Sequence, residues 1–262
     1  MILRRIAQHL KQQHWTGVFI ELVIVVIGVF LGMQVSNWND ARKTHERARA
    51  YTRQLRNDLR VEYAHSRSLL AYDADALQAA KAAYDGLTKQ RRMKDRTILV
   101  NAYRATQFQW YERHSAAYDE LLSAGELDLV TDPILRNTAV RYYGNSQTTL
   151  ELTLQDRRDS DYRRLFYRRV SPFVQIALQK DCGDRAYTLS NGISGLLSIG
   201  YPCNPSVDDA TVGNAADVLR SDPEVLPALR HQITVYNVEI NNLTYLFDDT
   251  GMRSLFAKEK ME

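Results

Sequence analysis

The sequence predicts an all-α protein in which an N-terminal transmembrane helix continues into an antiparallel bundle of long helices. An apolar run lies near the N-terminus, and apolar residues recur after it at three- and four-residue steps. No stretch alternates apolar and polar residues for long enough to indicate a sheet. We expect a short basic tail at 1–15, a membrane-spanning signal-anchor at 16–35 and a helical domain at 36–262.

The run from Thr16 to Val35 has the length and composition of a membrane span. A helix of about 20 residues, at about 1.5 Å per residue, covers the roughly 30 Å of a bilayer's hydrocarbon core. Glu21 is its one formal charge, and Trp15 and Trp38 flank it where indole rings sit at the headgroups. A cleaved signal peptide is the main alternative, but the run is longer than that class has and no small-residue cleavage signal follows. We expect a retained anchor, with the lipid bilayer as its first partner.

Two features inside the span are candidate interaction sites. Gly28 and Gly32 form a small-xxx-small step, which lets two helix backbones approach closely. Such steps also arise by chance, so pairing with a second copy or another membrane protein is one of two interpretations. Glu21 lies close enough to the end of the span to reach the headgroups. The alternative is a role in partner binding or proton handling, because an acid inside a membrane is costly.

One long helix is expected to run on from the span, because no Pro and no Gly occur between Asn39 and Gly86. The charged stretch Lys89–Asp95 makes the first turn. Further helices are predicted at 96–107, at 115–124 with Gly125 at its end, and from Pro133, capped by Asp132, to about Val170.

The last helix is predicted from a capping box at Ser221–Glu224. Apolar residues then follow at alternating steps of three and four, which is the pattern of a heptad seam: Leu226, Leu229, Ile233, Tyr236, Ile240, Leu243 and Phe247. Before this helix, a polar stretch rich in Gly and Asp is expected to be irregular up to about Asn214.

Cys182 and Cys203 enclose a stretch that contains Gly and Ser, and no other cysteine competes for either. We expect a disulfide that closes this loop, a bond that persists in oxidising compartments. The alternative is a pair of buried thiols. The disulfide places the N-terminus in the cytoplasm and the helical domain outside, since Lys and Arg are plentiful on both sides of the span and do not decide the orientation.

The overall charge is nearly balanced, with 34 Lys and Arg against 31 Asp and Glu, so it indicates no nucleic-acid partner. The basic excess near the span is typical of headgroup contacts. On one continuous helix, Arg157, Arg164 and Arg168 would share a face that could bind an anion or a partner. Interleaved aspartates favour the alternative of a solvated face with intrahelical ion pairs.

The sequence contains no GxSxG, HExxH, CxxC or Gly-rich phosphate loop. Its six histidines are scattered, and its adjacent carboxylates point to different faces of a helix. We therefore expect no catalytic residue, no metal site and no cofactor.

Two segments resemble an uncharacterised family of bacterial membrane proteins, domain of unknown function 6090. The first is an acidic and apolar span that ends in Asn-Trp-Asn, and the second is a short helix, a Gly turn and a new helix: Glu21–Gly28 with Gln34–Asn39, and Ala117–Val130 with Leu135-Arg136 and Tyr142-Tyr143. The resemblance implies an N-terminal span followed by helices in a bacterial inner membrane, with a periplasmic domain. It supplies no reaction or substrate.

These observations predict a single-pass, membrane-anchored helical protein that acts as a non-catalytic interaction or scaffold module. It would bind a second copy or another membrane protein through the span and the heptad faces. The alternative is an extracytoplasmic sensor domain that binds a small ligand, such as an anion, near Arg157, Arg164 and Arg168 and signals through a partner.

Overall fold

The computed structural model describes residues 15–90 and 92–257, with the side chains of 19–90, 92–146 and 150–257. The chain divides into two compact units, residues 1–51 and 52–262. Each unit is described by itself. The predicted tail lies almost entirely outside the described residues, and so does the side chain of Trp15.

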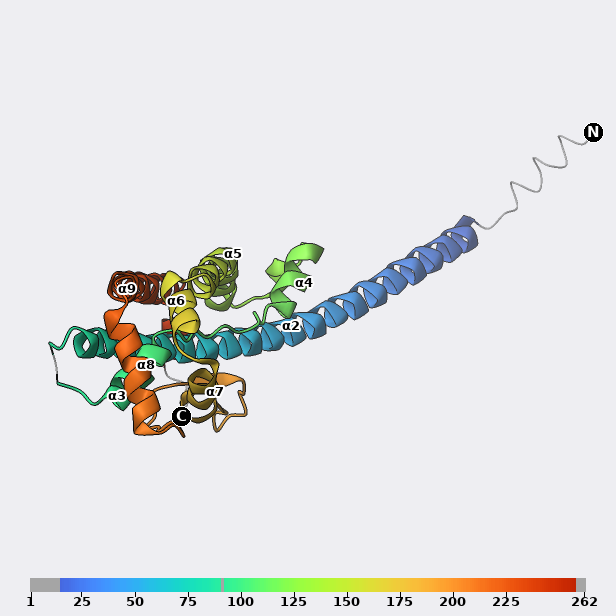
Figure 1. Cartoon of the computed structure of the whole chain (residues 1–262). Helices are drawn as coiled ribbons and strands as arrows, with labels where there is room; N and C mark the ends of the chain where they lie inside the picture. The colour runs from blue at the N-terminus through green and yellow to red at the C-terminus, as the bar shows by residue number, and fades with distance from the viewer. Residues whose placement is uncertain (1–14, 91, 258–262) are drawn as a thin grey trace, which may run out of the picture. The chain divides into compact units, whose positions relative to one another are not determined.

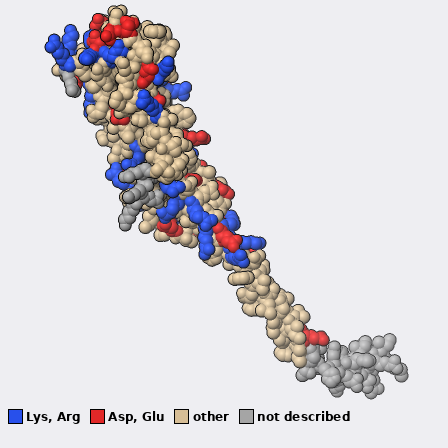
Figure 2. Space-filling model, turned by 90° about the horizontal axis from the view of Figure 1, so that it is seen from below, with Lys and Arg blue, Asp and Glu red and all other residues tan. Residues whose placement is uncertain are grey.

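The first unit contains the N-terminal part of helix α2, which runs from Trp15 to Leu87. Every large apolar side chain from Phe19 to Val35 is exposed, and Trp38 is 69% exposed. Among the described residues, α2 is the one helix long and apolar enough to cross a membrane. Figure 2 shows the apolar stretch as a band of surface without Lys or Arg. The chain thus has a long apolar N-terminal helix that could be a membrane anchor.

The second unit is a helical bundle with one small hairpin (Figure 1). Its elements after α2 are α3 (Asp95–Arg104), α4 (Ala116–Ala124), η1 (Leu127–Leu129), α5 (Pro133–Arg158), α6 (Asp161–Arg169), α7 (Pro172–Cys182), β1 (Arg185–Tyr187), β2 (Leu196–Ser198), α8 (Asp209–Ser221), α9 (Val225–Asp249) and α10 (Met252–Phe256). The predicted fold class, a long N-terminal helix followed by a helical bundle, is confirmed.

The C-terminal part of α2 is the central element of the bundle. In Figure 1, α5, α6 and α9 lie on one side of it, α3 and α7 lie on the other, and α8 crosses in front of it. Its buried positions recur with the helical period, and they include Leu55, Leu59, Tyr72, Ala76, Ala80 and Ala83. The small alanines let neighbouring helices approach closely. The long run of regularly spaced apolar residues in α2 is therefore buried against helices on several of its sides.

Several predicted helix ends are confirmed. Gly125 ends α4 and adopts a left-handed backbone conformation, with φ of 67°. Residues that have a Cβ adopt this conformation only at a cost in free energy. Asp132 caps α5 by accepting hydrogen bonds from the backbone N–H of Ile134 and Leu135, and Pro133 occupies the first turn.

The predicted single helix from Pro133 to Val170 is wrong, because the chain forms two helices there. Helix α5 ends at Arg158, and the hydroxyl of Ser160 caps α6 by accepting a hydrogen bond from the backbone N–H of Arg163, at 3.3 Å. A serine side chain offers the backbone a partner outside the helix, and here this local bond ends one helix and starts the next.

The predicted capping box at Ser221 is also wrong. Ser221 is the last residue of α8, and its hydroxyl bonds back to the carbonyl of Asp217. Helix α9 starts at Val225 instead, after Asp222 accepts a hydrogen bond from the backbone N–H of Glu224. The second half of the stretch that we expected to be irregular is helical, because α8 begins at Asp209, where Asp208 caps it through the N–H of Thr211.

The disulfide between Cys182 and Cys203 is present, and it joins two residues that lie 21 positions apart in the sequence. The loop is more regular than predicted, because β1 and β2 pair in antiparallel register with Ala186 opposite Leu197. Cys182 also ends a helix, α7, that the sequence analysis missed. A disulfide that closes a loop of this length adds about 3 kcal/mol to the free energy of unfolding, because the bond reduces the chain entropy of the unfolded state.

The heptad seam of α9 faces the protein's own interior. Leu229, Tyr236 and Leu243 are fully buried and Phe247 nearly so, while Ile233 and Ile240 pack on the main core. The seam is therefore occupied by helices of the same chain and is not exposed for a partner.

Candidate functional site: a pocket between α2 and α5

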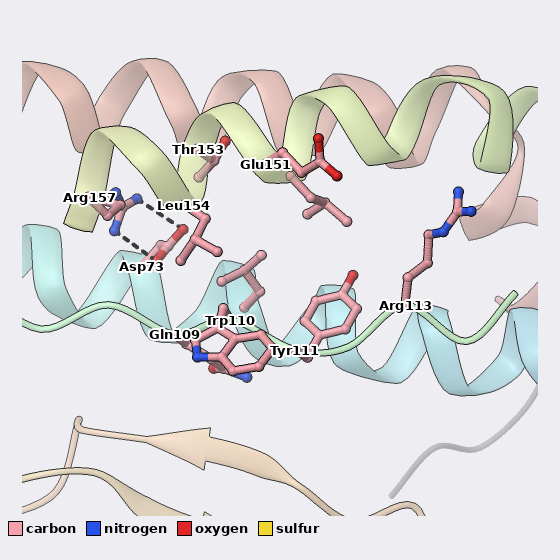
Figure 3. Close-up of a pocket in the computed structure, with 11 residues that line it drawn as sticks. Asp73, Gln109, Trp110, Tyr111, Arg113, Glu151, Thr153, Leu154 and Arg157 are labelled. Carbon is pink, nitrogen blue, oxygen red and sulfur yellow. Dashed lines mark hydrogen bonds and ion pairs between the residues drawn. The ribbon is translucent and has the colours of Figure 1, made fainter. Parts of the chain in front are cut away.

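A pocket of about 280 Å³ lies between α2, α5 and the segment 105–115 that joins α3 to α4 (Figure 3). Each of the three contributes a group of neighbouring residues: Leu69 and Asp73 from α2, Gln109, Trp110, Tyr111 and Arg113 from the segment, and Leu150, Glu151, Thr153, Leu154 and Arg157 from α5. Leucines and aromatic rings make up much of the wall, and charged groups stand at its two ends.

Side chains from other elements hold the segment 105–115 in place. The hydroxyl of Tyr236 donates to the carbonyls of Ala105 and Gln107, at 3.2 and 2.8 Å. A guanidinium N–H of Arg163 donates to the carbonyl of Thr106 at 2.7 Å. These bonds satisfy backbone groups that have no helix or sheet partner, so they fix the pocket wall that the segment forms.

Arg157 occupies the closed end of the pocket between two buried carboxylates. Its Nη1 donates to Asp73 at 3.1 Å, its Nη2 lies 3.1 Å from the other oxygen of Asp73, and its Nε donates to Glu239. The three side chains are only 1–5% exposed. The guanidinium carbon also lies 3.9 Å from the ring centroid of Tyr236. This ion-pair triad links α2, α5 and α9.

A single guanidinium cannot neutralise both carboxylates of the triad. Burial raises the pKa of Asp73, and it raises the pKa of Glu239 to about 7, although Arg157 opposes both shifts. Both acids are bound to the same arginine, so together the three side chains hold α2, α5 and α9 in place. Asp73 and Arg157 also line the pocket, where they set the charge of its closed end.

Gln109 is the polar side chain of the pocket that the protein leaves unsatisfied. It is 6% exposed, and neither atom of its amide has a hydrogen-bond partner among the described residues. Leaving a buried donor or acceptor unpaired costs roughly 1–3 kcal/mol. A bound molecule that offers both a donor and an acceptor would remove this cost.

The opposite end of the pocket is more open. Trp110 is 63% exposed, and Glu151 is exposed on α5. Arg113 is engaged elsewhere, because its Nη1 donates to the carbonyl of Tyr143 at 3.1 Å and its guanidinium lies over the Tyr143 ring. Figure 3 shows Arg113 at the far end from Asp73.

A second buried polar network supports the wall at Tyr111. Glu62 of α2 is fully buried and accepts hydrogen bonds from the hydroxyl of Tyr142 and the backbone N–H of His114. Burial raises the pKa of Glu62. The Tyr111 hydroxyl lies 3.4 Å from that of Tyr142 and 3.2 Å from that of Ser66.

His65 stacks on the Tyr111 ring, with centroids 4.8 Å apart. Burial lowers the pKa of His65 to about 4, so this imidazole is neutral at pH 7. Together, the network and the stacked ring fix Tyr111 against α2.

The three arginines predicted to share a helical face do not lie together. Arg157 is buried in α5, whereas Arg164 and Arg168 belong to α6 and line an open groove with His231 of α9. The prediction assumed one helix, and the break before Ser160 removes the common face. Arg164 instead pairs with Asp161 one turn away, at 2.5 Å, as the alternative interpretation expected.

The predicted residues of the span all lie in the first unit. Gly28 and Gly32 are open, since a Cβ added to either would meet no atom of the described residues within 4 Å. Glu21 is also exposed. Within residues 15–90 and 92–257, no three His, Cys, Asp or Glu side chains gather in a way that could hold a metal ion.

The sequence analysis missed Asp73, Gln109 and Glu239. Two of them carried a signal: Asp73 lies four residues from Leu69 and from Leu77, and Glu239 adjoins the heptad seam, so each is an acid on an apolar helix face. Gln109 carried none, because it lies in a segment without periodicity.

The triad predicts an unusual pH dependence of stability. With the pKa of Glu239 raised from 4.5 to about 7, the folded state holds a proton that the unfolded state releases, so this group's contribution falls as pH rises through that window. The free energy of unfolding of wild type, relative to Glu239→Gln, should drop by about 3 kcal/mol between pH 4 and pH 8. Urea unfolding across this range measures it. The exposed control Glu224→Gln should follow wild type, and parallel curves for wild type and Glu239→Gln would contradict the assignment.

Comparison with known proteins gives a family and no function. The family of unknown function DUF6090 matches residues 21–152, about half of the chain. This region contains most of the apolar stretch, Asp73, the segment 105–115 and Glu151, and it ends before Arg157. No curated protein and no solved structure gives a significant match. The extent of the family match shows that the chain belongs to the family of unknown function DUF6090.

Proposed function

We propose that this protein is a membrane-anchored, non-catalytic binding protein whose helical domain takes up a small ligand in the pocket between α2 and α5. The observation that carries the proposal is the buried amide of Gln109, which has no hydrogen-bond partner among the described residues and lines an otherwise largely apolar pocket. Such pockets, with a few polar groups that fix orientation, are the usual form of small-molecule sites.

The membrane part of the proposal rests on the apolar stretch of α2. Its large side chains from Phe19 to Val35 are all exposed, and an apolar surface of this extent is stabilised by transfer into lipid. The disulfide favours an oxidising compartment for the helical domain. We therefore propose a cytoplasmic N-terminus and a periplasmic domain. We also propose the bacterial inner membrane, which is what the family resemblance implies.

Ligand binding suits this structure better than contacts through the heptad face, because the seam of α9 is buried in the same chain. A ligand in the pocket would contact α2 at Leu69 and Asp73, and α2 is also the helix that carries the apolar stretch. Binding that holds α2 against α5 is a means by which such a domain could report to a partner in the membrane.

Filling the pocket should abolish ligand binding. Leu150→Trp places a large ring in the space that a ligand would occupy, whereas Leu152→Trp alters an exposed position two residues away on the same helix. For the detergent-solubilised protein screened against a metabolite library, a ligand at about 100 times its Kd adds roughly 2.7 kcal/mol, a rise in Tm of roughly 5–10 °C.

Binding should also change the emission of Trp110, which Trp110→Phe isolates from the other tryptophans. We expect hits in wild type and Leu152→Trp that vanish in Leu150→Trp. Hits that persist unchanged in Leu150→Trp would place the ligand elsewhere.

We also propose that the span mediates self-association, because the Gly28 and Gly32 face is open. Replacing both glycines by Leu should abolish crosslinked dimers in membranes. Val23→Leu with Val26→Leu, which the 3.6-residue period places roughly opposite the glycines on the same helix, is the control that should leave the dimers intact. Unchanged crosslinking of the glycine variant would remove the span from this role.

A further inference from the structure

The charges around the pocket also indicate the chemical class of ligand, an inference that rests on the proposed function. At the closed end, two buried carboxylates share one guanidinium, so the triad carries an excess of negative charge when both acids are ionised. Buried charges without a full complement of partners are costly. An added positive charge near Asp73 would lower that cost.

An anionic ligand does not fit this end of the pocket. All three nitrogens of Arg157 lie against carboxylate oxygens, and Tyr236 covers one face of the guanidinium. An incoming anion would have to displace Asp73 or Glu239 and would be repelled by both. Arg113, at the far end of the pocket, is engaged with Tyr143 and Asp119.

A cation, in contrast, finds acceptors and aromatic rings. Figure 3 shows Trp110 and Tyr111 along the side of the pocket formed by the segment 105–115, with Asp73 at its end. The amide oxygen of Gln109 has no donor among the described residues, and Glu151 adds a carboxylate on the α5 side. Aromatic faces attract ammonium and guanidinium groups, by about 0.5–2 kcal/mol per contact.

We infer that the ligand of this pocket is a small organic cation, an amine or guanidine attached to an apolar body. The cationic group lies toward Asp73 and Gln109, and the apolar body lies among Leu69, Leu150 and Leu154. The volume of about 280 Å³ is near the lower end of the range for ligand pockets, so the ligand has the size of a monoamine.

A series of three probes with the same ring tests this inference: 2-phenylethylamine, 2-phenylethanol and 3-phenylpropanoate. Binding to the full-length protein in mild detergent is followed through Trp110 emission excited at 295 nm, where the probes do not absorb. We expect the amine to bind about tenfold more tightly than the alcohol, as for a charged hydrogen bond, and the carboxylate to bind more weakly than both.

Asp73→Asn should reduce the advantage of the amine to about threefold or less, because it removes the nearest negative charge. Asp75→Asn, two residues along α2 and outside this pocket, should keep the full advantage. Should Asp73→Asn fail to fold, Glu151→Gln, on the surface of α5, serves as a second variant and should weaken the amine alone.

The two proposals fail in different ways. Equal binding of amine and alcohol, lost in Leu150→Trp, would overturn the inference of a cation and leave the pocket as a binding site. Tighter binding of the carboxylate, or no binding of the amine at millimolar concentration, would also overturn it. Amine binding that survives Leu150→Trp unchanged would contradict the pocket itself.

Discussion

The buried ion pairs of Arg157 are the interaction on which the rest of the helical domain depends. Arg157 is on α5, Asp73 on α2 and Glu239 on α9, so one guanidinium fixes three helices that are more than 80 residues apart in sequence. Exchanging such a buried cluster for apolar residues can be neutral for stability, whereas removing one member leaves a buried charge unpaired at a cost of about 3–5 kcal/mol. The triad therefore selects one arrangement of the three helices more than it adds to the free energy of unfolding. It allows no slip of α5 along α2, because a slip would separate the charges.

The neighbouring features follow from this arrangement. Just after Arg157 the chain turns, and Ser160 donates to Gln232 of α9 while it caps the next helix. Tyr236, on whose ring Arg157 lies, bonds through its hydroxyl to the carbonyls of segment 105–115 and so positions the wall that carries Gln109 and Trp110. The pocket is thus the space that remains between α2, α5 and this segment once the triad and Tyr236 have set their spacing. The acidic excess at its closed end, which is present when both acids are ionised, is a consequence of the same triad.

Local signals predicted the longest helix and several helix ends, but they missed α7, α8, the break between α5 and α6, and the pocket. The uninterrupted pattern after Asn39, the Asp132-Pro133 start and the Gly125 end are short-range features, and each is realised as expected. Helix starts were less certain, since Ser221 suits a cap by its sequence but is the last residue of α8, and α9 begins at Val225. The seam of α9 has the same spacing whether it pairs with another chain or with its own. The pocket joins residues from three distant segments, and Gln109 matters because of what surrounds it, which no local pattern records.

The central claim is that the pocket holds a small molecule, and native mass spectrometry of the protein purified from its own membrane in mild detergent tests it most directly. We expect wild type to retain a bound species of a few hundred daltons or less that collisional activation releases, and Leu150→Trp, prepared in parallel, to lack it. The contradicting result is a wild-type protein that carries no such species, so that its mass differs from that of Leu150→Trp only by the substitution. The membrane span would then be the part of the chain to study.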